Sequence, residues 1–159
     1  SSIMIVCWAV ASPICGALSD RVGRRKTIHA SGCVIATIGW ILLFYAPLSL
    51  AAWVVVASVT SFASGSVVIG FAYAKESVPV RFLGTISAAV NIGNMVGPMI
   101  LQPGIGWLLD KKWAGTMVNG VRVYGVPAFH TAFLLVIGWL VLASILLSLT
   151  RETHCKHTA

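Results

Sequence analysis

Residues 129–149 read FHTAFLLVIGWLVLASILLSL, a continuous apolar stretch without a charged side chain. A helix of about 20 such residues spans the ~30 Å hydrocarbon layer of a bilayer. Four other apolar runs precede it, and all eleven basic and four acidic side chains of the chain lie outside the five runs. The runs are residues 3–18, 28–46, 51–74, 84–109 and 129–149. The pattern predicts an all-α integral membrane protein with five transmembrane helices.

The composition also favours a membrane protein. Of 159 residues, 58% are hydrophobic and 9% are charged, whereas a soluble domain carries roughly 25% charged residues. The runs are continuous rather than alternating, which favours helices over a β-barrel. The net charge of +7 does not indicate nucleic-acid binding, because the basic residues lie at the expected helix ends, where they set topology.

His154 and His157 have no further ligand cluster near them in the sequence, so neither a metal site nor another cofactor is predicted.

The distribution of Lys and Arg predicts the orientation in the membrane. Eight lie in the connections 19–27 and 75–83 and in the tail after residue 149, whereas three lie in the connections 47–50 and 110–128. Alternate connections share one side of the membrane, and basic residues concentrate on the cytoplasmic side. We therefore expect a multi-pass protein of a plasma membrane or bacterial inner membrane, with its C-terminus in the cytoplasm.

The first connection contains a loop, residues 16–26, that reads GALSDRVGRRK. Gly16 would allow a neighbouring helix to approach closely, and Gly23 would allow a tight turn. Asp20 would accept hydrogen bonds at the positive amino end of a neighbouring helix. The arginines would pair with carboxylates or anionic head groups, although an ordinary basic loop is the alternative. The residues singled out here are Gly16, Asp20, Arg21, Gly23, Arg24 and Arg25.

This GxxxDRxGRR pattern resembles the signature loop of the major facilitator superfamily (MFS), found between helices 2 and 3 and again between helices 8 and 9. The second basic loop reads ESVPVRFLGT from residue 76. It is similar to the ExxPxRxxG pattern between helices 10 and 11 of many members. That pattern falls on Glu76, Pro79, Arg81 and Gly84. The resemblance covers essentially the whole chain. It implies helices 8 to 12, part of the C-terminal six-helix half of a twelve-helix fold.

The resemblance implies transport rather than enzymatic activity. A small-molecule substrate would cross the lipid bilayer by alternating access, with helices 1–7 as the missing partner of this piece. The chain has no initiating Met, so we expect a fragment. The ending of the 84–109 run and the tail RETHC are similar to bacterial intraphagosomal amino-acid transporters, which suggests an amino acid or another small organic metabolite. Coupling to H⁺ or Na⁺ stays open, because no carboxylate lies within a run.

The intramembrane amides all fall in the run 84–109. Asn91, Asn94 and Gln102 share a face within about 80° on a helical wheel, opposite a glycine face. Polar groups in a membrane usually face an interior or water, so these amides are candidates for lining a cavity or for interhelical hydrogen bonds. Pro98 and Pro103 remove backbone hydrogen bonds and are expected to bend the helix.

Two other functional classes compete with transport. The chain could be a complete small membrane protein with a structural or partner-binding role, or an inactive truncated product. An intramembrane enzyme is not supported, because the runs carry no nucleophile–His–acid constellation.

Overall fold

The computed structural model describes residues 2–155. Its elements are α1 (Ser2–Val22), α2 (Arg25–Tyr45), α3 (Leu50–Ser64), η1 (Gly65–Val67), α4 (Val68–Glu76), η2 (Val80–Phe82), α5 (Leu83–Lys111), β1 (Met117–Val118), β2 (Val121–Arg122) and α6 (Val126–Leu149). Five helical segments are long and apolar enough to cross a membrane, with α3, η1 and α4 together forming the third. This confirms the predicted fold class.

The helices run past the apolar stretches into the charged residues at their borders. Asp20 lies in the last turn of α1, Arg25 begins α2, and Glu76 ends α4. The sequence reading placed these side chains in loops, because their charges interrupt the apolar pattern. Backbone hydrogen bonds continue along a helix whichever side chains it carries, so charged residues can belong to its last turns. The extra turns therefore hold charged side chains in fixed positions at the ends of the bundle.

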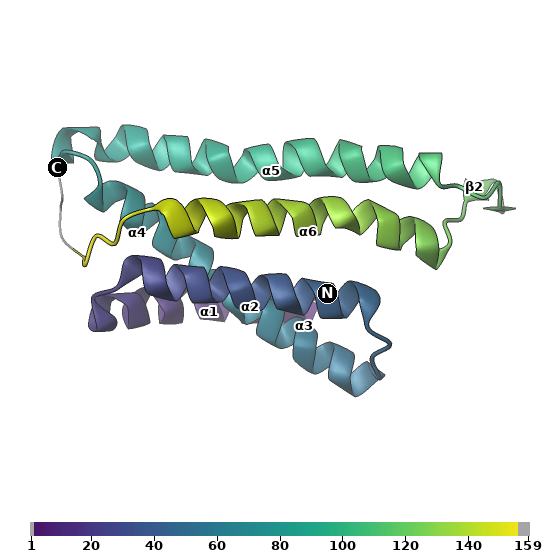
Figure 1. Ribbon diagram of the computed structural model, residues 1–159, viewed down its shortest axis with the longest axis horizontal. Coiled ribbons are helices and arrows are strands. Elements are labelled where there is room, and N and C mark those ends of the chain that lie inside the picture. The colour runs from purple at the N-terminus through teal and green to yellow at the C-terminus, as the bar shows by residue number, and fades with distance from the viewer. Residues whose placement is uncertain (1, 156–159) are drawn as a thin grey trace.

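The helices form two groups (Figure 1). Helices α1, α2 and α3 pack together, and α5 lies beside α6. Contacts of α2 with α6 and of α4 with α5 join the groups. We call the end where α4 and α6 finish the charged end, and the opposite end, where β1 pairs with β2, the hairpin end.

The third span contains a 3-10 segment, η1, between α3 and α4, and it is closely packed there. A Cβ added to Gly65 would lie 2.6 Å from the Cβ of Ala11 and 3.1 Å from its backbone carbon. Ala11 is fully buried and Ser66 is almost so. Without a side chain at Gly65, α1 can lie directly against the third span, and small residues allow this kind of close helix packing in membranes.

Helix α2 meets the third span along a second seam of small residues. A Cβ on Gly32 would lie 2.6 Å from the Cβ of Ser66, and one on Gly39 would lie 2.9 Å from the Cβ of Thr60. Thr60 is fully buried. These two seams bring α1, α2 and α3 into close contact, and they fix where the helix ends meet.

Candidate functional site

The connection between α1 and α2 is a two-residue turn that positions Arg25. Gly23 adopts φ +67°, a left-handed conformation that glycine adopts without a steric penalty. Arg24 then takes an extended conformation and α2 begins at Arg25. The sequence prediction that Gly23 permits a tight turn agrees with this geometry. The turn directs Arg25 back across the end of α1.

Arg25 is the centre of a buried polar cluster. Its Nε and Nη2 atoms donate to Oε1 of Glu76 at 3.0 and 2.8 Å. Its Nη1 donates to Oγ of Ser19 at 3.2 Å and to Oδ1 of Asp20. Arg25 and Glu76 are each only 8% exposed. Thr153 completes the cluster by donating to Oε2 of Glu76 at 2.6 Å. A buried ion pair is tolerated when such additional hydrogen bonds satisfy it.

The carboxylate of Glu152 caps the amino end of α2. It accepts backbone N–H bonds from Arg25 at 2.7 Å, Lys26 at 3.1 Å and Thr27 at 3.2 Å. The sequence reading gave this role to Asp20. In the structure Asp20 contacts the Arg25 side chain instead, because it belongs to the last turn of α1 rather than to the loop. The anionic cap comes from the other end of the chain.

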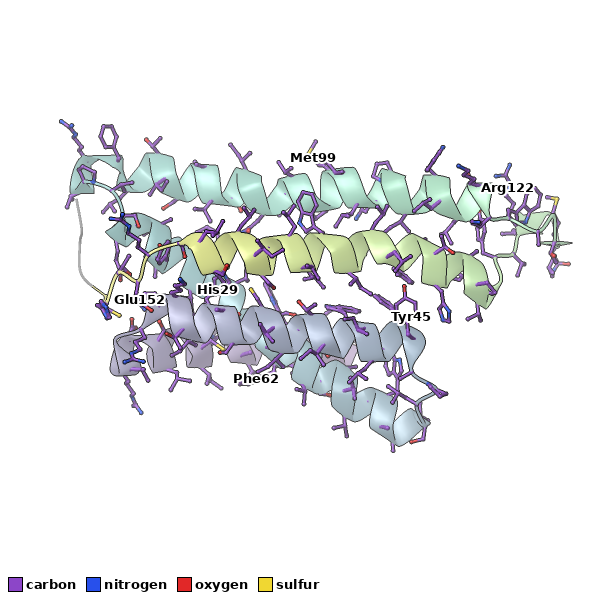
Figure 2. The ribbon with its side chains drawn as sticks, viewed as in Figure 1. His29, Tyr45, Phe62, Met99, Arg122 and Glu152 are labelled. Atoms are coloured by element: carbon purple, nitrogen blue, oxygen red, sulfur yellow. The ribbon has the colours of Figure 1, made fainter. Side chains whose placement is uncertain are left out.

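Figure 2 labels Glu152 in the tail after α6, and other contacts hold the tail at several further points. Nζ of Lys26 donates to the carbonyl oxygens of Ser148 at 2.7 Å and Thr150 at 2.8 Å. The Tyr73 hydroxyl donates to the carbonyl oxygen of Arg151. Cationic groups near the carboxyl end of a helix satisfy carbonyls that lack intrahelical partners. The end of α6 is therefore tied to both α2 and α4.

The other residues of the two predicted loops make fewer contacts. Arg21 and Arg24 are exposed, and neither forms an ion pair within the described part of the chain, residues 2–155. The guanidinium of Arg81 lies 4.8 Å from the centre of the Phe82 ring. Pro79 precedes η2. Of the two loops, the structure brings together only Asp20, Arg25 and Glu76.

The two motif glycines outside the turn, Gly16 and Gly84, are not crowded by the described residues. A Cβ on Gly16 would meet only Cγ1 of Val68, at 4.0 Å, and one on Gly84 would meet nothing within 4 Å. The close approach expected at Gly16 is found instead at Gly65.

Lowering the pH should reveal how much Glu152 contributes to the stability of the folded protein. Burial raises the pKa of its carboxyl, but the backbone N–H groups of Lys26, Thr27 and Arg25 lower it, so the net pKa lies below the usual value. A lowered folded-state pKa means that this stabilisation is present above the unfolded-state pKa, about 4.3, and is lost as the pH falls through the folded-state pKa. We expect Glu152→Ala to cost about 1 kcal/mol at pH 7 and to flatten the fall in melting temperature between about pH 5 and pH 3. Identical melting curves for both proteins across this range would contradict the capping role.

A second candidate region lies along the apolar spans, between α2, the third span, α5 and α6. It is a cavity of about 590 Å³, which we call the membrane groove. Asn94, Pro98 and Gln102 line it, whereas Asn91 does not. The structure therefore splits the three amides that the wheel placed on one face. The remaining lining comprises His29, Gly32, Cys33, Ala36, Ala63, Ser64, Ser66, Val67, Gly93, Gly97, Leu101, Ile105, Val136, Trp139, Leu140 and Ala143.

His29 is a groove residue that the sequence pattern does not single out. The structure places it in the second turn of α2, facing the groove, with Nδ1 3.3 Å from Oγ of Ser66. The available signal was its position beside Gly32, within a run otherwise poor in polar groups.

The glycine face of α5 packs against α6. A Cβ on Gly97 would lie 3.4 Å from Nε1 of Trp139, and one on Gly104 would lie 3.1 Å from Cδ1 of Leu135. Helix α5 continues as one α-helix through Pro98 and Pro103, and Figure 1 shows no sharp kink in it. Bending at the two prolines stays a prediction.

The hairpin end carries a separate, exposed cluster. Arg122 donates to Oδ1 of Asp110 at 2.8 Å, and the Tyr124 hydroxyl donates to the same oxygen at 2.6 Å. Both charged side chains are about half exposed. Within residues 2–155, no group of three or more His, Cys, Asp or Glu side chains could hold a metal ion. His157 lies outside the described residues.

Comparisons with known proteins agree with the loop motifs. The family model described as Major Facilitator Superfamily matches residues 1–158. Comparison with curated proteins and with solved structures gave no match. The family match covers nearly the whole chain, and the five apolar spans are those of a multi-pass membrane protein. The chain belongs to the Major Facilitator Superfamily, whose members are not enzymes but carry solutes across membranes by secondary transport.

Proposed function

We propose that this chain forms helices 8 to 12 of a twelve-helix transporter that works by alternating access. The order of the features supports this assignment: a GxxxDRxGRR loop, an ExxPxRxxG loop, a helix rich in glycine and proline, and a plain apolar helix. The charged end would face the cytoplasm, because its connections carry eight Lys and Arg residues against three at the other end.

The observation that carries this proposal is the buried cluster around Arg25. It joins the α1–α2 turn to the end of α4 through charges that are removed from water. Separating buried charges is costly unless water or new partners replace them. We propose that the cluster is closed in one conformation of the transport cycle and open in the other. The loop from Asp20 to Arg25 would act as a latch that holds one conformation of the transport cycle.

For the substrate we propose a small polar metabolite such as an amino acid. Asn91 and Met99 are exposed on α5, and Figure 2 shows Met99 on the side of α5 that faces away from α6. An exposed amide within a span favours contact with a watery path or another protein surface over contact with lipid. The face around Asn91 is our candidate for solute contact. The similarity of the tail to amino-acid transporters supports the substrate class.

Two measurements on the native protein test the proposal. An antibody against residues 151–159 should detect a polypeptide of about 45 kDa in source membranes, as expected for twelve helices. Cells that produce this polypeptide should take up a labelled amino acid or related metabolite faster than cells in which its gene is disrupted. A band at the 16.8 kDa of these 159 residues, together with unchanged uptake, would contradict transport and favour a structural role.

Asp20→Asn should change transport rate rather than selectivity. The substitution weakens one contact of the latch, and because the Asp20 side chain is 64% exposed we expect a shift of about 1 kcal/mol, or several-fold in rate. Initial uptake rates for a panel of substrates would measure this. Asp110→Asn, which weakens an exposed pair at the other end, is the matched control. An altered substrate preference with normal turnover would contradict the latch.

A further inference from the structure

We infer that a second groove, between α1, α2 and α3, binds one acyl chain of an anionic phospholipid whose head group pairs with Arg21 and Arg24. We call it the outer groove. It uses a different face of α2 from the membrane groove and shares with it only small residues, Gly32, Ala63 and Ser66. The inference rests on the proposed function in one respect: the charged end faces the cytoplasm, where the membrane surface is anionic.

Two adjoining cavities form the outer groove. The cavity nearer the charged end has a volume of about 290 Å³, and the next one along α2 has a volume of about 240 Å³. Ile35 and Val59 line both cavities, so the two are continuous. The other walls are mainly aliphatic or aromatic and include Leu18, Ile28, Phe62, Ile38 and Leu42. A surface of this kind is suited to a hydrocarbon chain.

The length and the opening of the outer groove also fit an acyl chain. Along α2 it runs from Ile28 to Leu42, which is about 21 Å at 1.5 Å per residue. The acyl chains of one leaflet extend through about 15 Å, half of the hydrocarbon layer. Leu18, Ile35 and Val59 are each about half exposed, so the groove is open to its surroundings. Figure 2 shows Phe62 on the side of α2 away from α6.

Two arginines lie beyond the end of the outer groove that is nearer the charged end. Arg21 follows Leu18 by three residues in α1, and Arg24 precedes Ile28 by four, immediately before α2 begins. This spacing is about one helical turn, or about 5 Å. Both arginines are exposed and form no ion pair within residues 2–155. A guanidinium group donates two parallel hydrogen bonds to a phosphate, so a head group at this position would find two available donors.

Other occupants fit the outer groove less well. Two copies of the chain joined across it by a two-fold axis would bring identical patches together, and their exposed arginines would repel each other. A further helix could cover the apolar walls but would leave both guanidinium groups without an anion. A phospholipid supplies the apolar chain and the anion in one molecule, and basic sites between helices on the cytoplasmic side bind anionic head groups.

Lipid retained by the purified native polypeptide gives the first test. Native mass spectrometry after extraction into detergent should show bound phosphatidylglycerol. The double variant Arg21→Gln with Arg24→Gln should retain several-fold less of it. Lys111→Gln with Lys112→Gln removes the same charge from exposed side chains at the hairpin end and is the matched control. Equal retention by the two double variants would overturn the inference.

The second test concerns the acyl chain. Phosphatidylglycerol added to the delipidated protein should raise its melting temperature by about 4 °C more than phosphatidylcholine does. Val59→Trp would fill the groove and should abolish this difference. Leu142→Trp, at a similarly exposed position of α6 outside the groove, should keep it. An undiminished difference in Val59→Trp, or an equal rise with glycerol 3-phosphate, which has no acyl chain, would overturn the inference.

Neither readout depends on solute uptake, so the lipid site and the proposed transport can fail separately. A polypeptide that transports nothing, yet retains phosphatidylglycerol through Arg21 and Arg24, would refute the transport and support the lipid site. Normal transport by a protein that binds the two phospholipids equally would support the transport and overturn the lipid site.

Discussion

Arg25→Met is expected to lower the free energy of unfolding by about 3 kcal/mol. The substitution removes both hydrogen bonds from the guanidinium to Glu76 and leaves that carboxylate in a site where it is only 8% exposed. Removing one partner of a buried ion pair is costly because the remaining charge loses its compensation. Reversible unfolding of the purified protein in detergent, followed by tryptophan fluorescence, would measure the loss.

Two further variants make this test specific. Arg122→Met removes the same functional group from the half-exposed pair with Asp110 and should cost no more than about 0.5 kcal/mol. The double variant Arg25→Met with Glu76→Leu should recover most of the loss, since apolar residues of similar volume often replace a buried pair without penalty. Equal losses of unfolding free energy for Arg25→Met and Arg122→Met would show that burial of the Arg25 cluster does not increase the cost of removing its arginine.

Gly65→Ala is expected to have the second large effect, a loss of about 2–3 kcal/mol. The added methyl group would lie 2.6 Å from the Cβ of Ala11 and 3.1 Å from the backbone nitrogen of Ser12. The backbone of α1 cannot move aside locally, so the whole helix must shift. The same unfolding measurement would report the loss, accompanied by a smaller yield of folded protein.

Gly16→Ala is the control for this change. Both positions lie in helical segments, so alanine improves the local propensity at each by up to about 1 kcal/mol. At Gly16 the new methyl group meets Val68 at an ordinary 4.0 Å, and the variant should be as stable as the parent or more so. Ala11→Gly should rescue Gly65→Ala by restoring the gap. If Gly16→Ala destabilised the protein as much as Gly65→Ala, the close contact between Gly65 and Ala11 would not be the cause of the loss.

The spans could be predicted from sequence because the bilayer leaves few alternatives. A stretch such as 129–149, with no charge, can only be solvated by lipid or protein, and its backbone must bond internally. The loop around Asp20 to Arg25 was also recognisable, because its glycine and charges have fixed spacing. These are local properties of the chain.

The partners of those residues could not be predicted, because they are set by how the helices meet. Nothing near Arg25 in the sequence points to Glu152, which is 127 residues away yet caps its helix. The wheel placed Asn91 on one face with Asn94, but the positions of α2 and α6 decide which of them borders the membrane groove, and only Asn94 does. The same holds for Gly65, whose neighbour Ala11 comes from another span.

The tail contacts have a consequence for biosynthesis. The cluster at Arg25 needs Glu76, 51 residues later, and Thr153, 77 residues after that. Glu152 and Thr153 follow the last span, α6, in the chain, so the cluster can be completed only after all five spans have been synthesised. Until then the amino end of α2 lacks its cap. Chains that stop a few residues early will carry every membrane span and still expose an unfinished surface, which gives quality-control proteases a means to remove them.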